Sequence, residues 1–413
     1  MELKRKLLVV FACLIFCFSC VFSQETGGSK KEVYAHFVTW FKTVEFSGRW
    51  EMWNSDWKQS PHDPNVIFLD GKRDLAVTSY PLTGPYDTSD PDILEYQFLL
   101  MKLSGIDGII VDWDGRRINK YRHEGLMSIL PYLEKYNMKL MMCFEEWCGY
   151  WPKGTFADRE AEIKAAQDEL QWMTETFLNK SFYGTVNGVK PVLVFRKVPD
   201  QWFNPTEWLR ISEAFKDTPV KLIFDLGAYQ QFGQAAGGKY FWVGSFDPKT
   251  NSSDLDFCKN VYTDFFKVKN QQIKDEIVFG GVTPGFDDTP VWGWGTGARK
   301  APRYDGKRFD LTWQMSIDNN VDVVQIITWN DWNEGTQIEP CDKYGYKYLE
   351  MNKKYVAKYK GVEDNVPNDV LKIPLKLYKA RKESKSDKAI LDELSKALFE
   401  KDFGKAKTLA EKL

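Results

Sequence analysis

The residues best suited to chemistry in this chain are two acidic side chains in its last quarter, Asp331 and Glu334. They lie three positions apart, and side chains alternate between the two faces of an extended strand. Both carboxylates therefore enter one cleft only if the chain bends after Trp329. Two carboxyl groups that flank a bond are what glycoside hydrolysis requires, since one protonates the leaving oxygen and the other serves as base or nucleophile. We predict that Asp331 and Glu334 form a catalytic pair.

Further acidic and aromatic residues follow other predicted strands and are candidates for substrate contact. Acidic, amide and guanidinium groups suit sugar hydroxyls, and exposed tryptophan rings suit the apolar C–H faces of sugars. A single Asp at a strand end is more often a helix cap, and a single Trp as often pins a loop. The argument depends on their convergence at one rim. The predicted substrate-binding residues are Trp40, Asp112, Asp114, Glu145, Glu146, Arg196, Asp225, Trp292, Trp294, Trp329, Asn330 and Trp332.

Composition narrows the remaining function classes. The 413 residues are 43% hydrophobic, so the chain has ample apolar material for a core and is not disordered. Its 56 basic and 58 acidic residues give a net charge of −2, which argues against a general nucleic-acid binder. The three histidines show no HExxH spacing, so we expect no zinc site, and no metal or organic cofactor is implied. The 16 Trp, 19 Tyr and 28 Phe are the unusual feature.

The elements that must position these residues alternate short β-rich runs with longer helical stretches. The runs are continuously apolar, which is typical of strands buried on both faces in a parallel sheet. We expect strands at 34–41, 108–113, 139–145, 191–196, 221–226, 241–246, 277–282 and 323–329. Eight strand–helix units predict an α/β (β/α)8 TIM barrel, in which catalytic residues lie at the carboxyl ends of the strands. A doubly wound open sheet is the alternative, but no Gly-rich GxGxxG motif follows the first strand.

Two long segments should form ordered walls of a cleft on the C-terminal face. The first, 47–91, carries Trp50, Trp53 and Trp57, and the second, 290–303, holds the run Trp292-Gly-Trp294-Gly. Loops of this length without regular structure are usually functional or disordered, and tryptophans favour order.

The chain divides into four predicted parts: a signal peptide at 1–23, a short linker at 24–32, the catalytic barrel at 33–360 and a helical tail at 361–413. A basic start, a 16-residue apolar run and a small-residue cleavage site are typical of a secretory signal. A lipid anchor at Cys20 is the alternative. We therefore expect a secreted, periplasmic or outer-surface monomer without a transmembrane span.

Charge and cysteine content also differ along the chain. Residues 372–413 carry 12 basic and seven acidic side chains, whereas residues 24–371 carry 41 and 50. The tail should form amphipathic helices around 390–398 and 403–413, either packed on the barrel, flexibly attached or lying on a membrane surface. Buried free thiols are expected for the four cysteines after the signal, with one disulfide bridge as the alternative: Cys143, Cys148, Cys258 and Cys341.

The segment 327–340 resembles the hallmark of glycoside hydrolase families 71 and 99. Its part 334–340 (Glu-Gly-Thr-Gln-Ile-Glu-Pro) is similar to family 99, the endo-acting α-mannosidases and α-mannanases. Its part 329–331 (Trp-Asn-Asp) is more similar to family 71, the α-1,3-glucanases. Segments 80–86 and 105–113 also resemble 71/99-like secreted bacterial proteins, so the resemblance spans roughly the whole barrel.

The resemblance implies roles for matching positions. Glu334 corresponds to the general acid, whose pKa should be raised by burial and neighbouring negative charge, and Asp331 to the second carboxylate, which should stay ionised. In family 99 that second group is a Glu acting on the sugar's own 2-hydroxyl. Asp is one methylene shorter, so an inverting route through water, with carboxyls about 6.5–9.5 Å apart, is equally open. Asn333 replaces a family 99 His, and Glu145 or Glu146 resembles a substrate-binding acid.

These observations predict an endo-acting glycoside hydrolase of α-linked glycans, of the α-mannan or α-1,3-glucan type, that degrades an oligo- or polysaccharide. One alternative is a non-catalytic glycan-binding barrel of a polysaccharide-uptake system. Another is a WbsX-like glycan-assembly protein, because the pattern Asn-x-Trp-x-Glu-Gly at 330–335 occurs there too. The secretion signal counts against the latter, since activated sugar donors are cytoplasmic.

Overall fold

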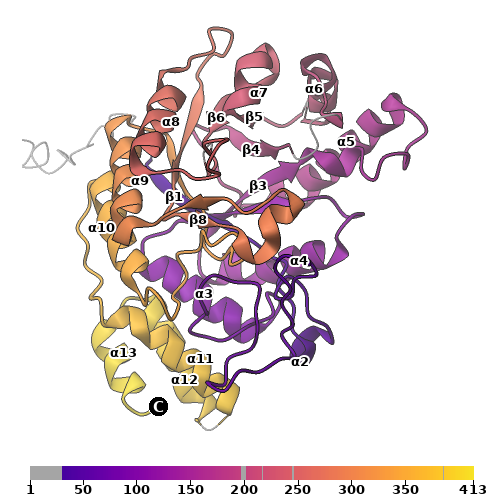
Figure 1. The fold of residues 1–413 in the computed structure, drawn as a ribbon. Coiled ribbons are helices and arrows are strands. Elements are labelled where there is room, and N and C mark those ends of the chain that lie inside the picture. Colours follow the sequence, from indigo (N-terminus) through magenta and orange to yellow (C-terminus); the bar gives the residue numbers. More distant parts are fainter. Residues whose placement is uncertain (1–29, 197–200, 216, 244–245, 385) are drawn as a thin grey trace, which may run out of the picture. The chain divides into compact units, whose positions relative to one another are not determined.

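The computed structural model describes residues 30–196, 201–215, 217–243, 246–384 and 386–413 (Figure 1). The predicted signal peptide and Cys20 lie outside these residues. Contacts divide the chain into residues 1–30 and a compact unit, Lys31–Leu413, which is the unit described below. Within the described residues, no helix is both long enough and apolar enough to cross a membrane.

The compact unit is built around a closed barrel of eight parallel strands in the order β1-β10-β7-β6-β5-β4-β3-β2, which confirms the predicted TIM barrel. β1 closes the ring, because Tyr34 pairs with Gly108 on one side and with Gln325 on the other. All strands run the same way, so their carboxyl ends meet at one rim. The strands are β1 (Glu32–Phe37), β2 (Gly108–Trp113), β3 (Lys139–Glu145), β4 (Lys190–Phe195), β5 (Val220–Asp225), β6 (Gly238–Tyr240), β7 (Ile277–Val282) and β10 (Val323–Ile326).

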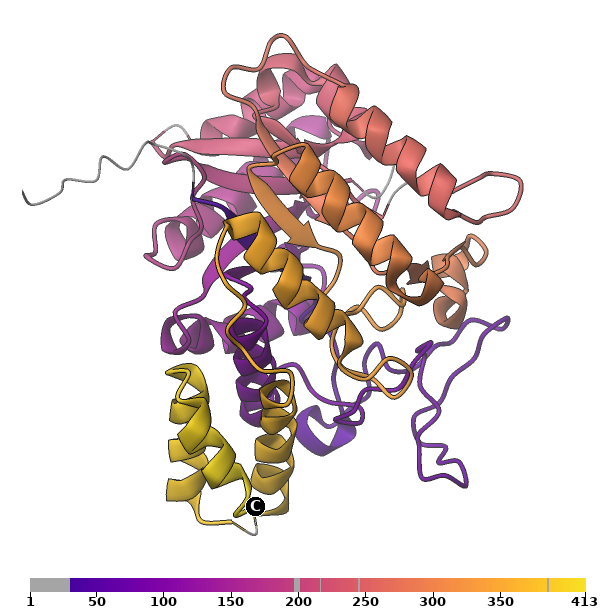
Figure 2. The same cartoon turned by 90° about the vertical axis from the view of Figure 1, so that its left-hand side faces the viewer.

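Helices follow the strands and cover the outside of the barrel (Figures 1 and 2). Asp90 starts the first long helix as its side chain accepts a hydrogen bond from the Asp92 backbone, and Pro91 stands at the first helical position. Asp158 caps another helix in the same way. The main helices are α3 (Pro91–Leu103), α4 (Lys120–Lys135), α5 (Arg159–Met173), α6 (Pro205–Ile211), α7 (Leu226–Gln231), α8 (Leu255–Lys267), α9 (Lys307–Asp318) and α10 (Lys347–Lys360).

The sixth strand departs from the prediction, which placed it at 241–246. The observed strand begins at Gly238 and ends at Tyr240. The pair Gly237-Gly238 at its start is a pattern typical of a turn. A Cβ atom on Gly238 would lie 2.1 Å from the Ile277 carbonyl oxygen, so close strand approach requires glycine here. Phe241 follows the strand, and its ring centroid lies 3.9 Å from that of Tyr262.

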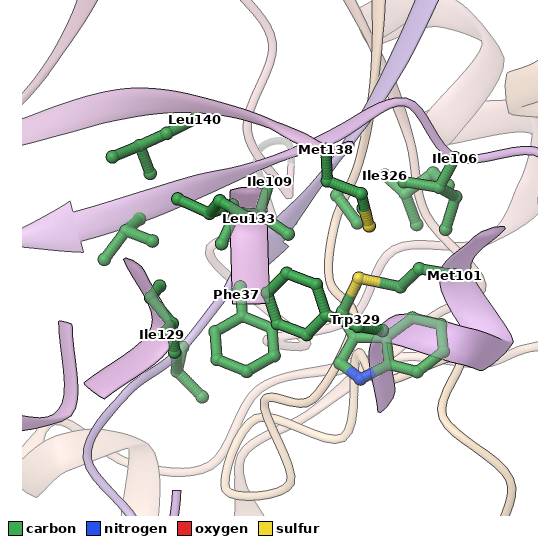
Figure 3. Close-up of a cluster of buried hydrophobic side chains, with 14 of the residues drawn as sticks. Phe37, Met101, Ile106, Ile109, Ile129, Leu133, Met138, Leu140, Ile326 and Trp329 are labelled. Atoms are coloured by element: carbon green, nitrogen blue, oxygen red, sulfur yellow. The ribbon is translucent and has the colours of Figure 1, made fainter. Parts of the chain in front are cut away.

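Two apolar layers hold the barrel together. One fills its interior and includes Tyr34, Ile110 and Phe279. The other lies between strands and helices, and Figure 3 shows part of it, with Phe37, Met101 and Trp329 gathered between the sheet and α3. The four predicted thiols are free and buried, as expected.

The long segments at the carboxyl rim are ordered. In the first, which follows the short α2 (Val44–Ser47), Trp53 is fully buried and its Nε1 donates to the Tyr86 carbonyl over 2.8 Å. Figure 2 shows part of this loop extending away from the barrel. The second contains a helical turn, Thr289–Gly295, between two short antiparallel strands, β8 (Phe286–Asp287) and β9 (Lys300–Ala301).

The tail forms three helices, α11 (Ile373–Glu383), α12 (Lys388–Phe399) and α13 (Phe403–Ala410), and α11 and α12 pack against α3. Arg381 pairs with the buried Glu95 of α3, and Lys382 lies 3.0 Å from Asp92. Basic groups of the tail thus meet acidic groups of the barrel. Of the expected arrangements, the one packed on the barrel is observed.

Candidate active site

A cavity of about 400 Å³ opens at the carboxyl ends of the barrel strands. It brings together six of the predicted site residues: Trp40, Asp112, Glu145, Trp294, Asp331 and Glu334. Charged and aromatic side chains from several strand ends converge there, as expected of a barrel active site. The remaining lining comes from Arg122, Phe195, Trp242, Val243, Phe286, Gly293, Thr296 and Arg299.

The chain bends after β10, and this bend brings the two carboxyl groups into the cavity. The Trp329 backbone N–H donates to the His36 carbonyl over 2.7 Å, which ties the bend to β1. The Asp331 backbone N–H donates to Thr328 Oγ1 over 2.9 Å, and Asp331 Oδ1 accepts from the Glu334 backbone N–H over 3.0 Å. The i,i+3 spacing therefore forms a turn in which one carboxylate holds the residue that carries the other.

Glu334 lies among groups that act on its pKa in opposite directions. Burial raises the pKa of Glu334 to about 7, and the charges of Asp288 and Asp112 add to this effect. A hydrogen bond from Trp294 Nε1 to Oε1, 2.9 Å long, favours the ionised form and lowers the pKa, as does the Arg299 charge. The expected raised pKa of Glu334 is present, with burial as its main cause.

Asp331 does not match the expectation of a permanently ionised carboxylate. Its side chain is buried, and burial together with the nearby Glu334 charge raises the pKa of Asp331 well above its usual range. Two neighbouring carboxyls titrate as a pair, because ionising one opposes ionising the other. The pair therefore retains a proton to higher pH than an isolated carboxyl group.

A guanidinium group that the sequence did not indicate forms another wall of the cavity. Arg122 of α4 donates from Nη1 to Glu145 Oε1 over 2.9 Å and lies 3.4 Å from Asp114 Oδ2. Its guanidinium stacks 4.4 Å from the ring centroid of Trp40. Arg122 was missed because it lies on a helix rather than at a strand end. Close packing of α4 brings it in, since a Cβ atom on Gly125 would lie 2.2 Å from the Thr39 carbonyl oxygen.

Comparisons with known proteins bear directly on this site. The model of glycosyl hydrolase family 99 matches residues 259–364, which include both carboxyl residues of the bend. The rat glycoprotein endo-alpha-1,2-mannosidase is 21% identical over 79% of this chain and 74% of its own length. The human glycoprotein endo-alpha-1,2-mannosidase-like protein is 22% identical over 75% and 68%. This chain is a glycoside hydrolase that resembles family 99.

Solved structures support the fold of the hydrolase. The GH99 endo-alpha-mannosidase from Bacteroides thetaiotaomicron superposes with a TM-score of 0.60 at 19% identity, covering 80% of this chain and 98% of that one. A protein described as glycoside hydrolase-like gives 0.57 at 12% identity, covering 80% and 94%. These likenesses agree with the predicted barrel, and the family match together with the named relatives confirms the predicted enzyme class.

Several residues predicted to bind substrate are instead buried in the protein next to the cavity and do not line it. Glu146 is buried, accepts from Trp208 Nε1 over 2.8 Å, and burial raises its pKa to about 8. Asp114 is buried beside Arg122 and does not line the cavity.

Arg196 and Asp225 pair with each other rather than lining the cavity. Arg196 Nη2 lies 3.1 Å from Asp225 Oδ2, and the guanidinium stacks 4.0 Å from the ring centroid of Trp202. Their predicted contact with substrate stays a prediction, since the Asp225 side chain is still 32% exposed.

Three residues of the bend that were predicted to bind substrate are buried instead. Trp329 and Trp332 are fully buried, so neither ring is available to stack on a sugar (Figure 3 shows Trp329). Trp332 Nε1 donates to the Tyr86 hydroxyl over 2.9 Å. Asn330 is buried as well, with Oδ1 accepting from the Val38 N–H over 2.9 Å and Nδ2 donating to its carbonyl over 3.0 Å. These residues hold the bend against the first strand and its loop.

Trp292 does not line the cavity, whereas Trp294 does. The missed Trp242 follows β6 and packs edge-on against His36, with 4.7 Å between ring centroids. Trp242 fell inside the misplaced sixth strand, which concealed its position at the rim. His36 Nδ1 in turn lies 3.4 Å from Asp112 Oδ1.

Asn333, at the position of the family 99 His, points away from the cavity into the long first loop. Its Nδ2 donates to the carbonyls of Met52 and Ala76 over 2.7 and 3.1 Å. Asn333 therefore fastens that loop to the bend. Across the part of the chain that the structure describes, no group of three or more His, Cys, Asp or Glu side chains is arranged to hold a metal ion.

Proposed function

We propose that this glycoside hydrolase cleaves α-mannosidic bonds within a glycan chain. The single observation that carries the proposal is the bend after β10, which places Asp331 and Glu334 in one cavity lined by Trp40, Trp242 and Trp294. Relatives whose names specify endo-α-1,2-mannosidase activity support the choice of linkage. A binding-only barrel needs no paired carboxyl groups with raised pKa values in its cavity.

In this proposal Glu334 donates its proton to the glycosidic oxygen as the bond breaks. A pKa near 7 leaves a substantial protonated fraction at neutral pH, which suits a general acid. The Trp294 N–H holds the Glu334 carboxyl in position and stabilises it once the proton has left. Asp331 then acts as the base, either on a water molecule or on the sugar's own 2-hydroxyl.

A substrate screen tests the proposal. The full chain is incubated with α-mannan, α-1,3-glucan and their oligosaccharides, and product sizes are followed by chromatography. We expect oligosaccharide products from α-mannan and a loss of at least about 100-fold in the Glu334→Gln variant. Hydrolysis of α-1,3-glucan alone would contradict the proposed linkage, and binding without hydrolysis would favour a glycan-binding barrel.

We further propose that the enzyme acts outside the cytoplasm, as a secreted, periplasmic or outer-surface protein. The support is the signal-peptide pattern of residues 1–23. Sequencing the N-terminus of the mature protein should find Gln24 first, whereas a lipid-modified Cys20 would show an anchored form.

A further inference from the structure

Two tryptophans of this aromatic-rich chain are exposed, and they lie on either side of one glycine. Among the described residues, Trp57 is 40% exposed and Trp294 is 37% exposed, while the other tryptophans are buried or half-buried. A Cβ atom on Gly295 would lie 2.7 Å from Trp57 Cη2, so the Trp57 ring rests directly on this backbone. Trp294 is the next residue, and it lines the cavity and contacts Glu334. Trp294 and Trp57 thus form an aromatic surface that runs from Glu334 in the cavity to the solvent-exposed loop.

The loop that carries Trp57 is ordered, so the exposed ring does not result from a loose segment. Ser55 and His62 exchange backbone hydrogen bonds of 3.0 and 2.9 Å, and the Ser60 N–H donates to the Trp57 carbonyl over 2.9 Å. His62 Nδ1 lies 2.7 Å from Asp74 Oδ1. These contacts hold Trp57 at the tip of a tight turn, although exposing so large an apolar ring to water is unfavourable.

The backbone of Trp294, the residue before Gly295, has an unfavourable conformation. Trp294 has φ of 55°, in the left-handed region that non-glycine residues rarely adopt. Such backbone strain persists only where the surroundings enforce it, often at ligand sites. The hydrogen bond to Glu334 explains the position of the Trp294 side chain. It does not explain why the exposed Trp57 ring packs on the adjacent backbone.

We propose that Trp57, together with the exposed edge of Trp294, forms a subsite for a pyranose ring outside the catalytic cavity. The ligand is a glycan chain that leaves the cavity across Gly295. Its apolar C–H face would cover the Trp57 ring. The residues that flank Trp57 along the chain, Asp56, Lys58 and Gln59, are also exposed and would supply polar groups for hydroxyls.

The size of the cavity supports this assignment. About 400 Å³ lies near the lower end of the roughly 300–1,000 Å³ of ligand sites, so a longer chain must continue outside it. The inference rests on the proposed function and adds to it a preference for long glycans.

The test compares wild type, Trp57→Phe and Trp57→Ala on α-linked oligosaccharides of increasing length. For the longest substrates we expect kcat/KM to fall about tenfold in Trp57→Ala, equivalent to about 1.4 kcal/mol, and less in Trp57→Phe. For the shortest substrates, which do not reach Trp57, kcat/KM should remain within twofold. Phe68→Ala is the matched control, because Phe68 is a 53% exposed aromatic residue of the same long loop.

Binding of a long oligosaccharide to the Glu334→Gln background, measured by calorimetry, gives a readout independent of turnover. If wild type hydrolyses none of the substrates, the proposed function fails, while a tenfold weaker binding caused by Trp57→Ala still supports the subsite. Equal losses at all lengths, or unchanged length dependence and unchanged affinity in Trp57→Ala, would overturn the inference. Thermal melting of Trp57→Phe confirms that the loop change leaves the barrel folded.

Discussion

At the scale of single residues, the site depends on how the proton of the carboxyl pair is controlled. Burial raises the pKa of Glu334 to about 7, the indole N–H of Trp294 lowers it, and the charge of Asp112 raises it. A general acid works only while protonated, so activity should fall as pH rises through the pKa of this pair. The pH at which activity falls, the alkaline limb of the pH profile, therefore shows how strongly these neighbours raise or lower the pKa.

Trp294→Phe and Asp112→Asn should move the alkaline limb in opposite directions. The first removes a hydrogen bond to ionised Glu334, so the pKa rises and the limb shifts to higher pH. The second removes a negative charge, so the pKa falls and the limb shifts to lower pH. Profiles of kcat/KM against pH should separate the two variants by about one unit or more. Shifts in the same direction would contradict this account.

The carboxyl pair was predictable because two carboxylates three residues apart need only one bend to enter the same cleft. Arg122 was not, because no local pattern reveals that a helix residue reaches the rim through close packing at Gly125. Trp332 was expected to face the cavity but faces the core, for a related reason. Sequence spacing shows that the chain turns, but not which side chains of the turn face the core.

At the scale of elements, the bend after β10 is fastened by a buried polar cluster. Tyr86 donates to Glu339 Oε2 over 2.7 Å, and Trp332 donates to the Tyr86 hydroxyl. Gln97 Nε2 donates to Glu339 Oε1 over 3.2 Å. Burial raises the pKa of Glu339 to about 8, so the folded protein holds this carboxyl largely neutral at pH 7. The cluster joins the bend to α3 and to the first long loop.

Glu339→Gln should therefore weaken the pH dependence of stability. The folded pKa exceeds the ordinary value of 4.5, so the folded state retains a proton that the unfolded state releases. Stability from this group is complete below about pH 4.5 and declines as pH rises toward 8. The melting temperature of Glu339→Gln should rise relative to wild type by about 2 °C or more between pH 5 and pH 8.

The matched control for this change is Glu363→Gln, because Glu363 is exposed in the loop after α10. It should melt in parallel with wild type at every pH. Parallel melting of Glu339→Gln as well would show that Glu339 is ionised in the folded protein.

At the scale of the whole chain, charge is divided between an acidic barrel and a basic tail. Arg381 of α11 pairs through two nitrogens with Glu95 of α3, which is buried and also accepts from Ser395 Oγ over 2.7 Å. The exposed Lys382 adds contacts at the start of α3. The tail is thus part of the folded unit that supports the helix preceding the second barrel strand.

Arg381→Ala should destabilise the protein by at least about 2 kcal/mol, since it leaves the charge of buried Glu95 poorly compensated. Denaturant unfolding measures this loss. The double variant Glu95→Gln with Arg381→Met should regain much of the stability, because it removes the charge as well as its partner. Lys382→Ala is the control and should cost less than about 1 kcal/mol, as its side chain is 40% exposed. Equal effects of the two single variants would contradict a special role for Glu95.

The barrel class was predictable from the repeated apolar runs, and seven strands were placed close to their observed positions. The sixth was not, because Gly237 and Gly238 resemble a turn while their lack of side chains serves close packing. The helical tail was also predictable from its periodicity. Its position was not, because charge content alone does not say which acidic surface a basic helix meets.

The central claim, that Glu334 is the general acid and Asp331 the second carboxylate of an α-glycan hydrolase, is tested most directly by changing the leaving group. We would measure kcat/KM of wild type, Glu334→Gln and Asp331→Asn on an α-linked manno-oligosaccharide and on α-mannosyl fluoride, whose leaving group needs little protonation. Glu334→Gln should lose at least about 100-fold on the oligosaccharide and much less on the fluoride, whereas Asp331→Asn should lose activity on both. Equal losses of Glu334→Gln on the two substrates, or full activity of either variant on the oligosaccharide, would contradict the assignment.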